Sequence, residues 1–176
     1  MLTLVLGGAR SGKSRFAQSL CETAGRVVFV ATARLDDDEM RARAAHHQQA
    51  RPKHWHTVEE PLEIARVVET CGADFDLVLI DCLTLWLSNL MLAGRDPGPA
   101  VTALADAIVA LAGPAILVSN EVGMGIVPDH KLSREFRDWQ GRANREIGAA
   151  CDAVIFVAAG LPLQLKPSTT PSVQLG

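Results

Sequence analysis

Five short runs of apolar residues, rich in branched side chains, recur along the chain. They are Leu2 to Leu6, Val27 to Ala31, Phe75 to Ile80, Ala115 to Ser119 and Ala153 to Ala158. Continuous apolar runs of this length are typical of strands buried on both faces, because a strand with one wet face alternates apolar and polar residues. The pattern therefore predicts a central sheet covered on both sides.

Segments with helical character lie between these runs. Helices are predicted over Lys13 to Ala24, Asp36 to Ala50, Pro61 to Cys71, Thr84 to Leu92, Gly98 to Ala112 and Leu132 to Ala150. The aspartates from Asp36 and the proline at position 61 suit helix N-termini. The alternation of strand and helix predicts an α/β fold with a mostly parallel, doubly wound sheet, helices on both faces and right-handed crossovers. Leu163 to Lys166 is a candidate short edge strand.

Length, charge and cysteine spacing narrow the class of protein. The 176 residues are about enough for one domain, predicted at residues 1–166, with a flexible Pro-, Ser- and Thr-rich tail at 167–176. The net charge is -3 with scattered Lys and Arg, which argues against a nucleic-acid binder. Met1 to Leu6 is too short for a membrane span or signal peptide, and the four cysteines lack metal or disulfide spacing. We therefore expect a cytoplasmic protein with buried, reduced thiols.

The first apolar run leads directly into a glycine-rich loop that fits the pattern G-x-x-x-x-G-K-[ST]. Its residues are Gly7, Gly8, Ala9, Arg10, Ser11, Gly12, Lys13 and Ser14. A predicted strand before the loop and a predicted helix after it are the context that this phosphate-binding motif requires. Backbone N–H groups and the positive end of the helix would face the phosphates, while Lys13 reaches the outer phosphates and the Ser14 hydroxyl holds Mg²⁺. The loop predicts nucleotide binding.

A carboxylate at the end of another predicted strand supports this interpretation. The segment "FDLVLIDCLT" is an apolar run that ends in Asp81. In phosphate-loop enzymes an acid at this place is the partner of Mg²⁺, so Ser14 and Asp81 are the predicted metal-side residues. Kinases and motor ATPases share these features, and the reaction stays open at this point.

Four of the five histidines fall between residues 35 and 61, at His46, His47, His54 and His56. They have three interpretations from residue type alone. They are exposed polar residues of an amphipathic segment, or zinc ligands, or one of them is a nucleophile that carries a transferred group on its imidazole. Spacing does not choose among the three, although the absence of a neighbouring cysteine disfavours zinc.

A resemblance adds to this picture. Four blocks in order, namely GGARSGKS, the H-H-x-x-x-R-P-x-x-W block from His46, "LIDCLTLWLSNLM" and "VSNEVGMGIVPDHKLSREFRDWQGRANREI", closely resemble the bifunctional adenosylcobinamide kinase / adenosylcobinamide-phosphate guanylyltransferase family of cobalamin biosynthesis. The resemblance implies a P-loop NTPase fold similar to RecA-type domains, and a homotrimer. It also implies phosphorylation of adenosylcobinamide on its aminopropanol hydroxyl, then transfer of GMP from GTP to that phosphate with release of pyrophosphate.

The resemblance also implies roles for individual residues. His46 would be the catalytic nucleophile that carries GMP. Nucleotide contacts beyond the loop would come from the residues that match the family pattern: Ala31, Thr32, Ala33, His47, Gln48, Gln49, Ala50, Glu59 and Asp81. We place the corrinoid substrate near Asn120, Glu121 and Arg142, because Asn120 follows a predicted strand and so lies at the ligand edge of the sheet.

Two other functions are compatible with the same phosphate loop. A phosphate-loop small-molecule kinase would need no histidine nucleophile, and a RecA-like ATPase switch would act on a macromolecule through conformational change. The sequence leaves open whether ATP or GTP supplies the kinase phosphate, which group deprotonates the substrate hydroxyl, and whether both activities are present.

Overall fold

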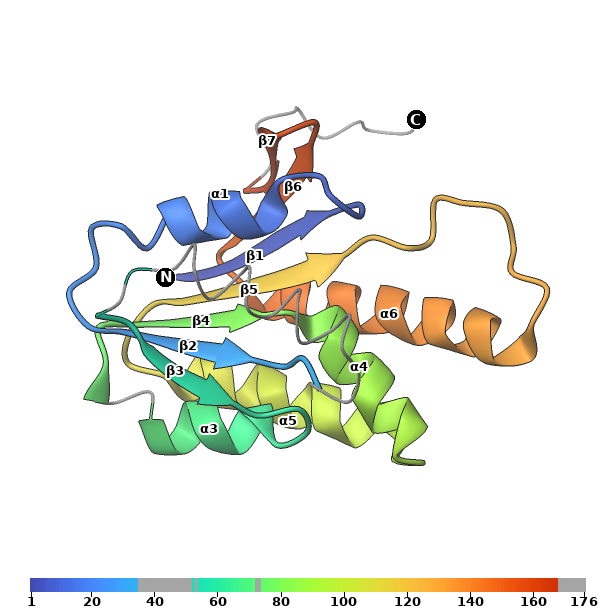
Figure 1. Cartoon of the computed structure of the whole chain (residues 1–176), viewed down its shortest axis with the longest axis horizontal. Coiled ribbons are helices and arrows are strands. Elements are labelled where there is room, and N and C mark those ends of the chain that lie inside the picture. Colours follow the sequence, from blue (N-terminus) through green and yellow to red (C-terminus); the bar gives the residue numbers. More distant parts are fainter. Residues whose placement is uncertain (35–51, 53, 72–73, 168–176) are drawn as a thin grey trace, which may run out of the picture.

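The computed structural model describes residues 1–34, 52, 54–71 and 74–167, and these contain one seven-stranded sheet in the order β3-β2-β4-β5-β1-β6-β7 (Figure 1). The strands are β1 (Leu2–Gly7), β2 (Val27–Ala31), β3 (His56–Glu59), β4 (Leu77–Asp81), β5 (Ala115–Asn120), β6 (Ala153–Ala158) and β7 (Leu161–Lys166). Neighbours from β3 to β6 run parallel, and β7 pairs antiparallel with β6 at the edge. The predicted mostly parallel sheet and its edge strand are confirmed.

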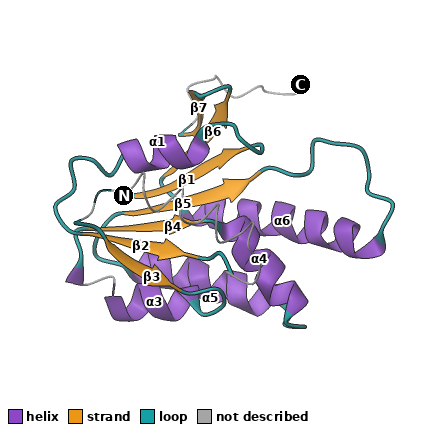
Figure 2. Ribbon diagram, viewed as in Figure 1, coloured by secondary structure: helices purple, strands orange, loops and turns teal. Residues whose placement is uncertain are grey.

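Helices cover both faces of this sheet, as Figure 2 shows. They are α1 (Lys13–Ser19), α3 (Ile64–Cys71), α4 (Leu83–Leu92), α5 (Pro97–Ala110) and α6 (Lys131–Ala150). Of these, α1 lies against one face, and α3 to α6 lie against the other. The prediction of a doubly wound α/β fold is confirmed.

Strand alternation divides the core into two clusters, because successive side chains of a strand point to opposite faces. The larger cluster lies under α3 to α6 and contains Leu4 of β1 and Leu117 of β5. The smaller one lies under α1 and contains Val5 of β1 and Val118 of β5. A polar residue at a strand end therefore points to the same face as the buried residues two and four positions before it in that strand.

Strand β3 is a strand that the pattern did not predict. It reads His56-Thr57-Val58-Glu59, and only Val58 among these is packed against the core. Its regular structure comes from parallel pairing with the open edge of β2, which is a tertiary contact. The stack of the His56 ring on Phe75, with centroids 5.3 Å apart, makes His56 part of the packing at this edge.

Several element boundaries differ from the predicted ones. Helix α3 begins at Ile64, three residues after Pro61, because the Glu60 carboxylate accepts hydrogen bonds from the N–H groups of Leu62 (2.8 Å) and Glu63 (2.9 Å). Helix α1 ends at Ser19, and a series of turns continues to Ala24. The predicted helix from Asp36 to Ala50 and the tail from residue 168 lie outside the described residues.

The four cysteines are free thiols. Cys21, Cys82 and Cys151 are buried as predicted, whereas Cys71 is only partly buried at the end of α3. The prediction of four buried thiols is therefore wrong for Cys71. None of the described helices has the length and apolar character to cross a membrane.

Candidate functional site

The phosphate loop connects β1 to α1 at the carboxyl edge of the sheet (Figure 1). Its turn depends on backbone angles that L-residues seldom adopt, with φ of 56° at Arg10 and 95° at Gly12. The Gly160 N–H donates to the Ser11 carbonyl at 2.8 Å, so the turn between β6 and β7 supports the loop from outside. The loop is thus held in shape by a segment far away in sequence.

Gly7 is the point of closest approach within this loop. A Cβ atom at Gly7 would lie 2.5 Å from the Ser11 Oγ and 2.5 Å from the Val157 carbonyl oxygen, whereas a Cβ at Gly8 would meet nothing within 4 Å. Position 7 therefore excludes any side chain, and position 8 opens onto free space. The Lys13 Nζ donates to the Gly8 carbonyl at 3.3 Å, which places the lysine ammonium over the loop.

Acidic residues end the neighbouring strands at the same edge. Register pairs Ala31 of β2 with both Asp81 of β4 and Glu59 of β3. Leu77 and Leu79 belong to the core under α1, so alternation places the Asp81 side chain on that face as well. The phosphate loop and the Asp81 carboxylate therefore share one edge and one face of the sheet.

Thr32 supports the segment that follows Asp81. Its hydroxyl donates to the Cys82 carbonyl at 2.7 Å and accepts from the Cys82 N–H at 2.8 Å. Its own N–H donates to the Asp81 carbonyl at 3.4 Å, and its carbonyl accepts from the Asn89 Nδ2 at 2.8 Å. Thr32 was predicted as a nucleotide contact, and each of its polar groups already has a protein partner.

The charges of Lys13 and Asp81 both act on the Cys82 thiol. Burial raises the pKa of Cys82 to about 11, with a further upward contribution from the Asp81 carboxylate, while hydrogen bonds from backbone N–H groups of α4 and the Lys13 ammonium oppose the shift. Because one group feels both charges, the predicted phosphate-side cation and metal-side acid lie in the same small region. Asp81 directly precedes Cys82 in the sequence, whereas Lys13 comes from a distant segment.

The residues present fit a magnesium ion. Among the described residues there is no group of three or more His, Cys, Asp or Glu side chains that could enclose a metal. Mg²⁺ in nucleotide sites needs no such cage, since one or two protein oxygens combine with water and phosphate oxygens. The Ser14 hydroxyl at the start of α1 and the Asp81 carboxylate at the same edge supply oxygens of this kind.

A buried polar network follows the next strand. The Ser119 Oγ donates to the Asn144 Oδ1 at 2.6 Å, and the Gln140 Nε2 donates to both of these oxygens at 2.9 and 3.0 Å. The Asn144 Nδ2 in turn donates to the Asn120 carbonyl at 3.0 Å. Helix α6 is thereby tied to the end of β5, where two predicted substrate residues, Asn120 and Glu121, are found.

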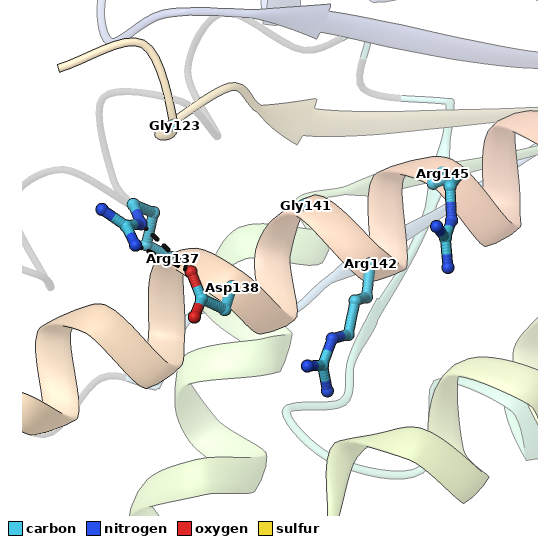
Figure 3. Close-up of a pocket in the computed structure, with 6 residues that line it drawn as sticks. All are labelled: Gly123, Arg137, Asp138, Gly141, Arg142 and Arg145. Atoms are coloured by element: carbon cyan, nitrogen blue, oxygen red, sulfur yellow. Dashed lines mark hydrogen bonds and ion pairs between the residues drawn. The ribbon is translucent and has the colours of Figure 1, made fainter. Parts of the chain in front are cut away.

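The segment 121–130 leads from β5 to α6, which extends beyond the carboxyl edge of the sheet (Figure 1). The Glu121 Oε1 accepts from the Gly123 N–H at 2.6 Å, so this carboxylate shapes the turn. A shallow hollow of about 380 Å³ lies between the turn and α6. It is lined by Gly123, Arg137, Asp138, Gly141, Arg142 and Arg145 (Figure 3).

The arginines of this hollow differ in their partners. In Figure 3 the Arg137 guanidinium turns toward Asp138, and its Nη2 donates to the Asp138 carboxylate at 3.0 Å. Arg142 and Arg145 extend in a common direction, and neither has an ion pair among the described residues. The Arg142 guanidinium lies 5.0 Å from the Trp139 ring centroid. Three guanidinium groups against one carboxylate make this hollow cationic.

The structure brings together the part of the predicted site that it describes. The loop from Gly7 to Ser14, the strand ends at Ala31, Glu59 and Asp81, and Asn120 gather at one edge, with Ala33 close behind Thr32. Arg142 stands apart on the exposed side of α6. Five predicted residues lie outside the described part of the chain: His46, His47, Gln48, Gln49 and Ala50.

Two supporting residues were not found from the sequence. The Thr84 Oγ1 accepts a hydrogen bond from the Asn120 N–H at 2.8 Å. The Asn89 Nδ2 donates to the Thr32 carbonyl at 2.8 Å and to the Pro61 carbonyl at 3.1 Å. Both are buried polar residues of the mostly apolar helix α4. A polar residue inside an apolar helix is the signal that indicates such a role.

Comparison with known proteins gives a consistent result. A protein-family model described as cobinamide kinase / cobinamide phosphate guanyltransferase matches residues 3–165. The chain is 45% identical over 170 residues to the bifunctional adenosylcobalamin biosynthesis protein CobP of Pseudomonas aeruginosa, covering 94% of this chain and 98% of the relative. It is 39% identical over 181 residues to the corresponding protein CobU of Escherichia coli K12, covering 94% of this chain and 100% of the relative.

Solved structures with similar folds have much lower identity. The flagellar accessory protein FlaH of Methanocaldococcus jannaschii is 15% identical with a TM-score of 0.57, over 94% of this chain and 77% of that one. A prototypical ATPase of the type III secretion system of pathogenic bacteria is 13% identical with a TM-score of 0.60, over 93% of this chain and 56% of that one. These likenesses bear on the fold alone, and they agree with the predicted RecA-like P-loop architecture.

Proposed function

The chain belongs to the cobinamide kinase / cobinamide phosphate guanyltransferase family, and from this premise we propose that it catalyses both reactions on adenosylcobinamide. It first transfers a phosphoryl group from a nucleoside triphosphate to the aminopropanol hydroxyl. It then transfers GMP from GTP to the new phosphate, which yields adenosylcobinamide-GDP and pyrophosphate.

One observation of the structure carries this proposal. The phosphate loop and Asp81 share an edge and a face of the sheet, with Lys13 above the loop and Ser14 at the start of α1. Backbone N–H groups of the loop, the helix dipole and the Lys13 ammonium stabilise negative charge on phosphates. Bound Mg²⁺, held by Ser14 and Asp81, would neutralise charge on the phosphate oxygens. Phosphoryl transfer requires this combination.

In the kinase reaction the substrate hydroxyl oxygen forms a bond to the γ-phosphorus, and the bond from that phosphorus to the β,γ-bridging oxygen breaks. The nucleoside diphosphate leaves, and the hydroxyl proton goes to a base. The chain's own contribution is to hold the triphosphate still and to stabilise its charge, which is most of what catalysis of phosphoryl transfer needs.

In the second reaction the bond that breaks lies between the α- and β-phosphates of GTP. We propose that an imidazole nitrogen of His46 attacks the α-phosphorus and releases pyrophosphate. A phosphate oxygen of adenosylcobinamide phosphate then attacks the same phosphorus and frees the histidine. His46 and its predicted neighbours from His47 to Ala50 lie outside the described residues, so their support is the resemblance in sequence.

The corrinoid side of the site is also a proposal. Asn120, Glu121 and Arg142 are the predicted substrate residues, and the cationic hollow on α6 adds support for Arg142, because a corrinoid phosphate is anionic. We further propose a homotrimer in the cytoplasm that binds no nucleic acid, as the resemblance and the charge distribution imply. Residues 1–166 form one catalytic domain in this proposal.

Intact-protein mass spectrometry after incubation with GTP and Mg²⁺ tests the proposal, with wild type and His46→Ala compared under a mildly alkaline quench. We expect a GMP-sized adduct in the wild type and none in the variant. His54→Ala is the matched control, because His54 is an exposed histidine of the same segment outside the predicted site, and it should keep the adduct. Phosphorylation of adenosylcobinamide by ATP or GTP is measured in parallel and should persist in His46→Ala.

The alternatives predict other results. A kinase without nucleotidyl transfer gives corrinoid phosphate but no adduct in the wild type. A RecA-like switch hydrolyses nucleotide without modifying the corrinoid. Loss of both reactions to the same degree in His46→Ala would contradict the assignment of His46 to the second reaction only.

A further inference from the structure

The side-chain amide of Asn89 joins two segments that are distant in the sequence. Its Nδ2 donates to the Thr32 carbonyl at 2.8 Å and to the Pro61 carbonyl at 3.1 Å. Thr32 directly follows β2, and Pro61 lies two residues beyond the end of β3. An amide NH₂ group has two hydrogens to donate, so both are used. Asn89 is 6% exposed, and this pair of hydrogen bonds is therefore made away from water.

The two carbonyls need such a donor because the sheet supplies none. Pairing of β2 with β4 ends at Ala31 and Asp81, and pairing of β2 with β3 ends at Ala31 and Glu59. A carbonyl beyond the last pair has no neighbouring strand to donate to it. A buried carbonyl without a partner costs free energy, and so does a buried amide without one. Asn89, in an otherwise mostly apolar helix, therefore continues the hydrogen bonding of the sheet past its edge.

Helix α4 begins two residues after Asp81 and holds the same region through a second side chain (Figure 1). The Trp86 Nε1 donates to the Leu62 carbonyl at 2.8 Å, and Trp86 is 1% exposed. Trp86 and Asn89 are three residues apart, so they lie on one face of the helix. Trp86 bonds to the segment after β3, whereas Asn89 bonds to the segments after both strands.

The segments that Asn89 joins carry one side of the predicted nucleotide site. Ala31 and Ala33 stand on either side of Thr32, and Glu59 ends β3. In the sheet order, β2 lies three strands and β3 four strands from β1, which carries the phosphate loop. At about 4.8 Å between neighbouring strands, these are separations of about 14 and about 19 Å. A nucleotide whose phosphates occupy the loop meets these residues with another part, which is the nucleoside.

The phosphate side of the site is held by different contacts. The Gly160 N–H supports the loop by donating to the Ser11 carbonyl at 2.8 Å. The Thr32 hydroxyl, and not its carbonyl, holds Cys82 at the start of α4. Asn89 makes none of these hydrogen bonds, so its removal leaves the contacts on the phosphate side in place.

From these contacts we propose that Asn89 is a positioning residue for the nucleoside half of the bound nucleotide. Its amide sets the separation of the two segments, and so places Ala31, Ala33 and Glu59 against the nucleoside without touching the ligand itself. The inference rests on the proposed function, because that proposal assigns these three residues to the nucleotide. It needs no corrinoid and no transfer reaction.

Titration calorimetry with Mg²⁺ tests the proposal by comparing α,β-methylene GTP with inorganic tripolyphosphate. The first ligand has an α,β linkage that cannot release GMP, and the second carries the phosphates without a nucleoside. Asn89→Leu removes both hydrogen bonds at similar volume. We expect the affinity for the GTP analogue to fall by about tenfold, as for one lost hydrogen bond to the nucleoside, and the affinity for tripolyphosphate to stay within about twofold.

Ile108→Val is the matched control for stability. Ile108 is fully buried on α5, in the core cluster that also contains Leu87 and Leu90 of α4. Loss of one methyl group should lower the melting temperature, as Asn89→Leu also does, yet leave both affinities unchanged. If Asn89→Leu does not fold, Asn89→Ser keeps one donor and should change the ratio of the two affinities in the same direction by a smaller factor.

An unchanged ratio of the two affinities in the Asn89 variants, or equal losses for both ligands, would overturn the inference. Glu59→Ala separates this outcome from failure of the proposed function. If Glu59→Ala weakens binding of the GTP analogue while the Asn89 variants keep the wild-type ratio, the proposed nucleotide contacts stand and only the positioning role is contradicted. A wild type that binds the GTP analogue no more tightly than tripolyphosphate would contradict both.

Discussion

Thr32 holds both sides of Cys82: its hydroxyl donates to the Cys82 carbonyl at 2.7 Å and accepts from the Cys82 N–H at 2.8 Å. Thr32 is fully buried, and its residue number is 50 away from that of Cys82. The turn between Asp81 and α4 is therefore positioned by the residue that follows β2. Asp81 can act on a metal only if this turn keeps its place, so the contact links the packing of β2 to the chemistry of the site.

Thr32→Val should reduce both stability and turnover. Valine has nearly the shape of threonine but leaves the Cys82 N–H unpaired and removes one of the two hydrogen bonds to the Cys82 carbonyl, which keeps the one from the Trp86 N–H at 3.2 Å. Leaving the buried N–H unpaired costs about 1–3 kcal/mol of unfolding free energy. Denaturant unfolding and kinase kinetics with ATP and GTP measure the two effects. Thr32→Ser keeps the hydroxyl and should retain most of the activity. Equal loss in the serine variant would mean that the packing of the methyl group contributes as much as the hydroxyl.

Gly7→Ala should distort the phosphate loop. The new Cβ would lie 2.5 Å from the Val157 carbonyl, a backbone atom that cannot turn away. We expect about 1–3 kcal/mol of lost stability, as for overpacking of a core. Nucleotide affinity should fall by at least about tenfold, because the loop loses the shape that fits phosphate. Calorimetry and thermal unfolding measure these changes.

Gly8→Ala is the comparison for folding, because its Cβ would meet nothing within 4 Å. Its melting temperature should stay close to that of the wild type. A Gly8→Ala variant as unstable as Gly7→Ala would contradict the close-approach argument.

Arg142→Ala should weaken binding of the phosphorylated corrinoid. Removing one of the three guanidinium groups of the hollow should raise the KM for adenosylcobinamide phosphate by roughly tenfold if Arg142 contacts that phosphate, with little effect on nucleotide affinity. Steady-state kinetics of GMP transfer measures this. Lys131→Ala, at the exposed start of the same helix, is the charge-matched control and should leave this KM unchanged. A rise in both variants would indicate general charge attraction.

The cysteines should differ sharply in reactivity. Burial raises the pKa of Cys21 and of Cys151 to about 12 and that of Cys82 to about 11, so these thiols stay protonated and inaccessible near neutral pH. Ellman's reagent at pH 8 should modify Cys71 promptly and the other three only after unfolding in guanidinium chloride. Prompt reaction of more than one thiol in the folded protein would contradict this order.

Asp76 gives a pH-dependent contribution to stability. A hydrogen bond from the Arg26 N–H, 2.8 Å from its Oδ2, is the main reason that the Asp76 pKa lies below its ordinary value of 3.8, and the Arg26 charge adds to it. The ionised carboxylate therefore contributes stability above about pH 4, which is lost as the pH falls through the lowered pKa. Asp76→Asn should show a small loss of stability at pH 7 that disappears in acid, as measured by urea unfolding across pH. A difference that persists in acid would assign the effect to packing.

Local patterns were enough to predict some features of the fold. The continuous apolar runs predicted five of the parallel strands, because a strand buried on both faces needs apolar residues at every position. Of these five, β6 is mostly only partly buried. The glycine loop and Asp81 could be recognised because phosphate binding demands small residues, a lysine and a hydroxyl at fixed spacing. The family resemblance was likewise readable from the chain and is confirmed by the comparisons. The role of His46 stays a prediction.

Other features depended on contacts between distant segments. His56–Glu59 has too few apolar residues to indicate a strand, and it is one because β2 offers an open edge beside it. Thr32 was predicted as a nucleotide contact. Its hydrogen bonds to Cys82 could not be predicted, because they depend on a segment 50 residues away in the sequence.

For this protein the sequence by itself determined the fold class, the family and the phosphate loop, since these follow from local periodicity and from motifs with fixed spacing. The tertiary structure alone decided which strand-end residues share the face of the sheet that carries the phosphate loop. Asn120 lies opposite Gly7 on the face of α1 because β5 pairs with β1 in one particular register, and a shift of one residue would turn its amide to the other side of the sheet.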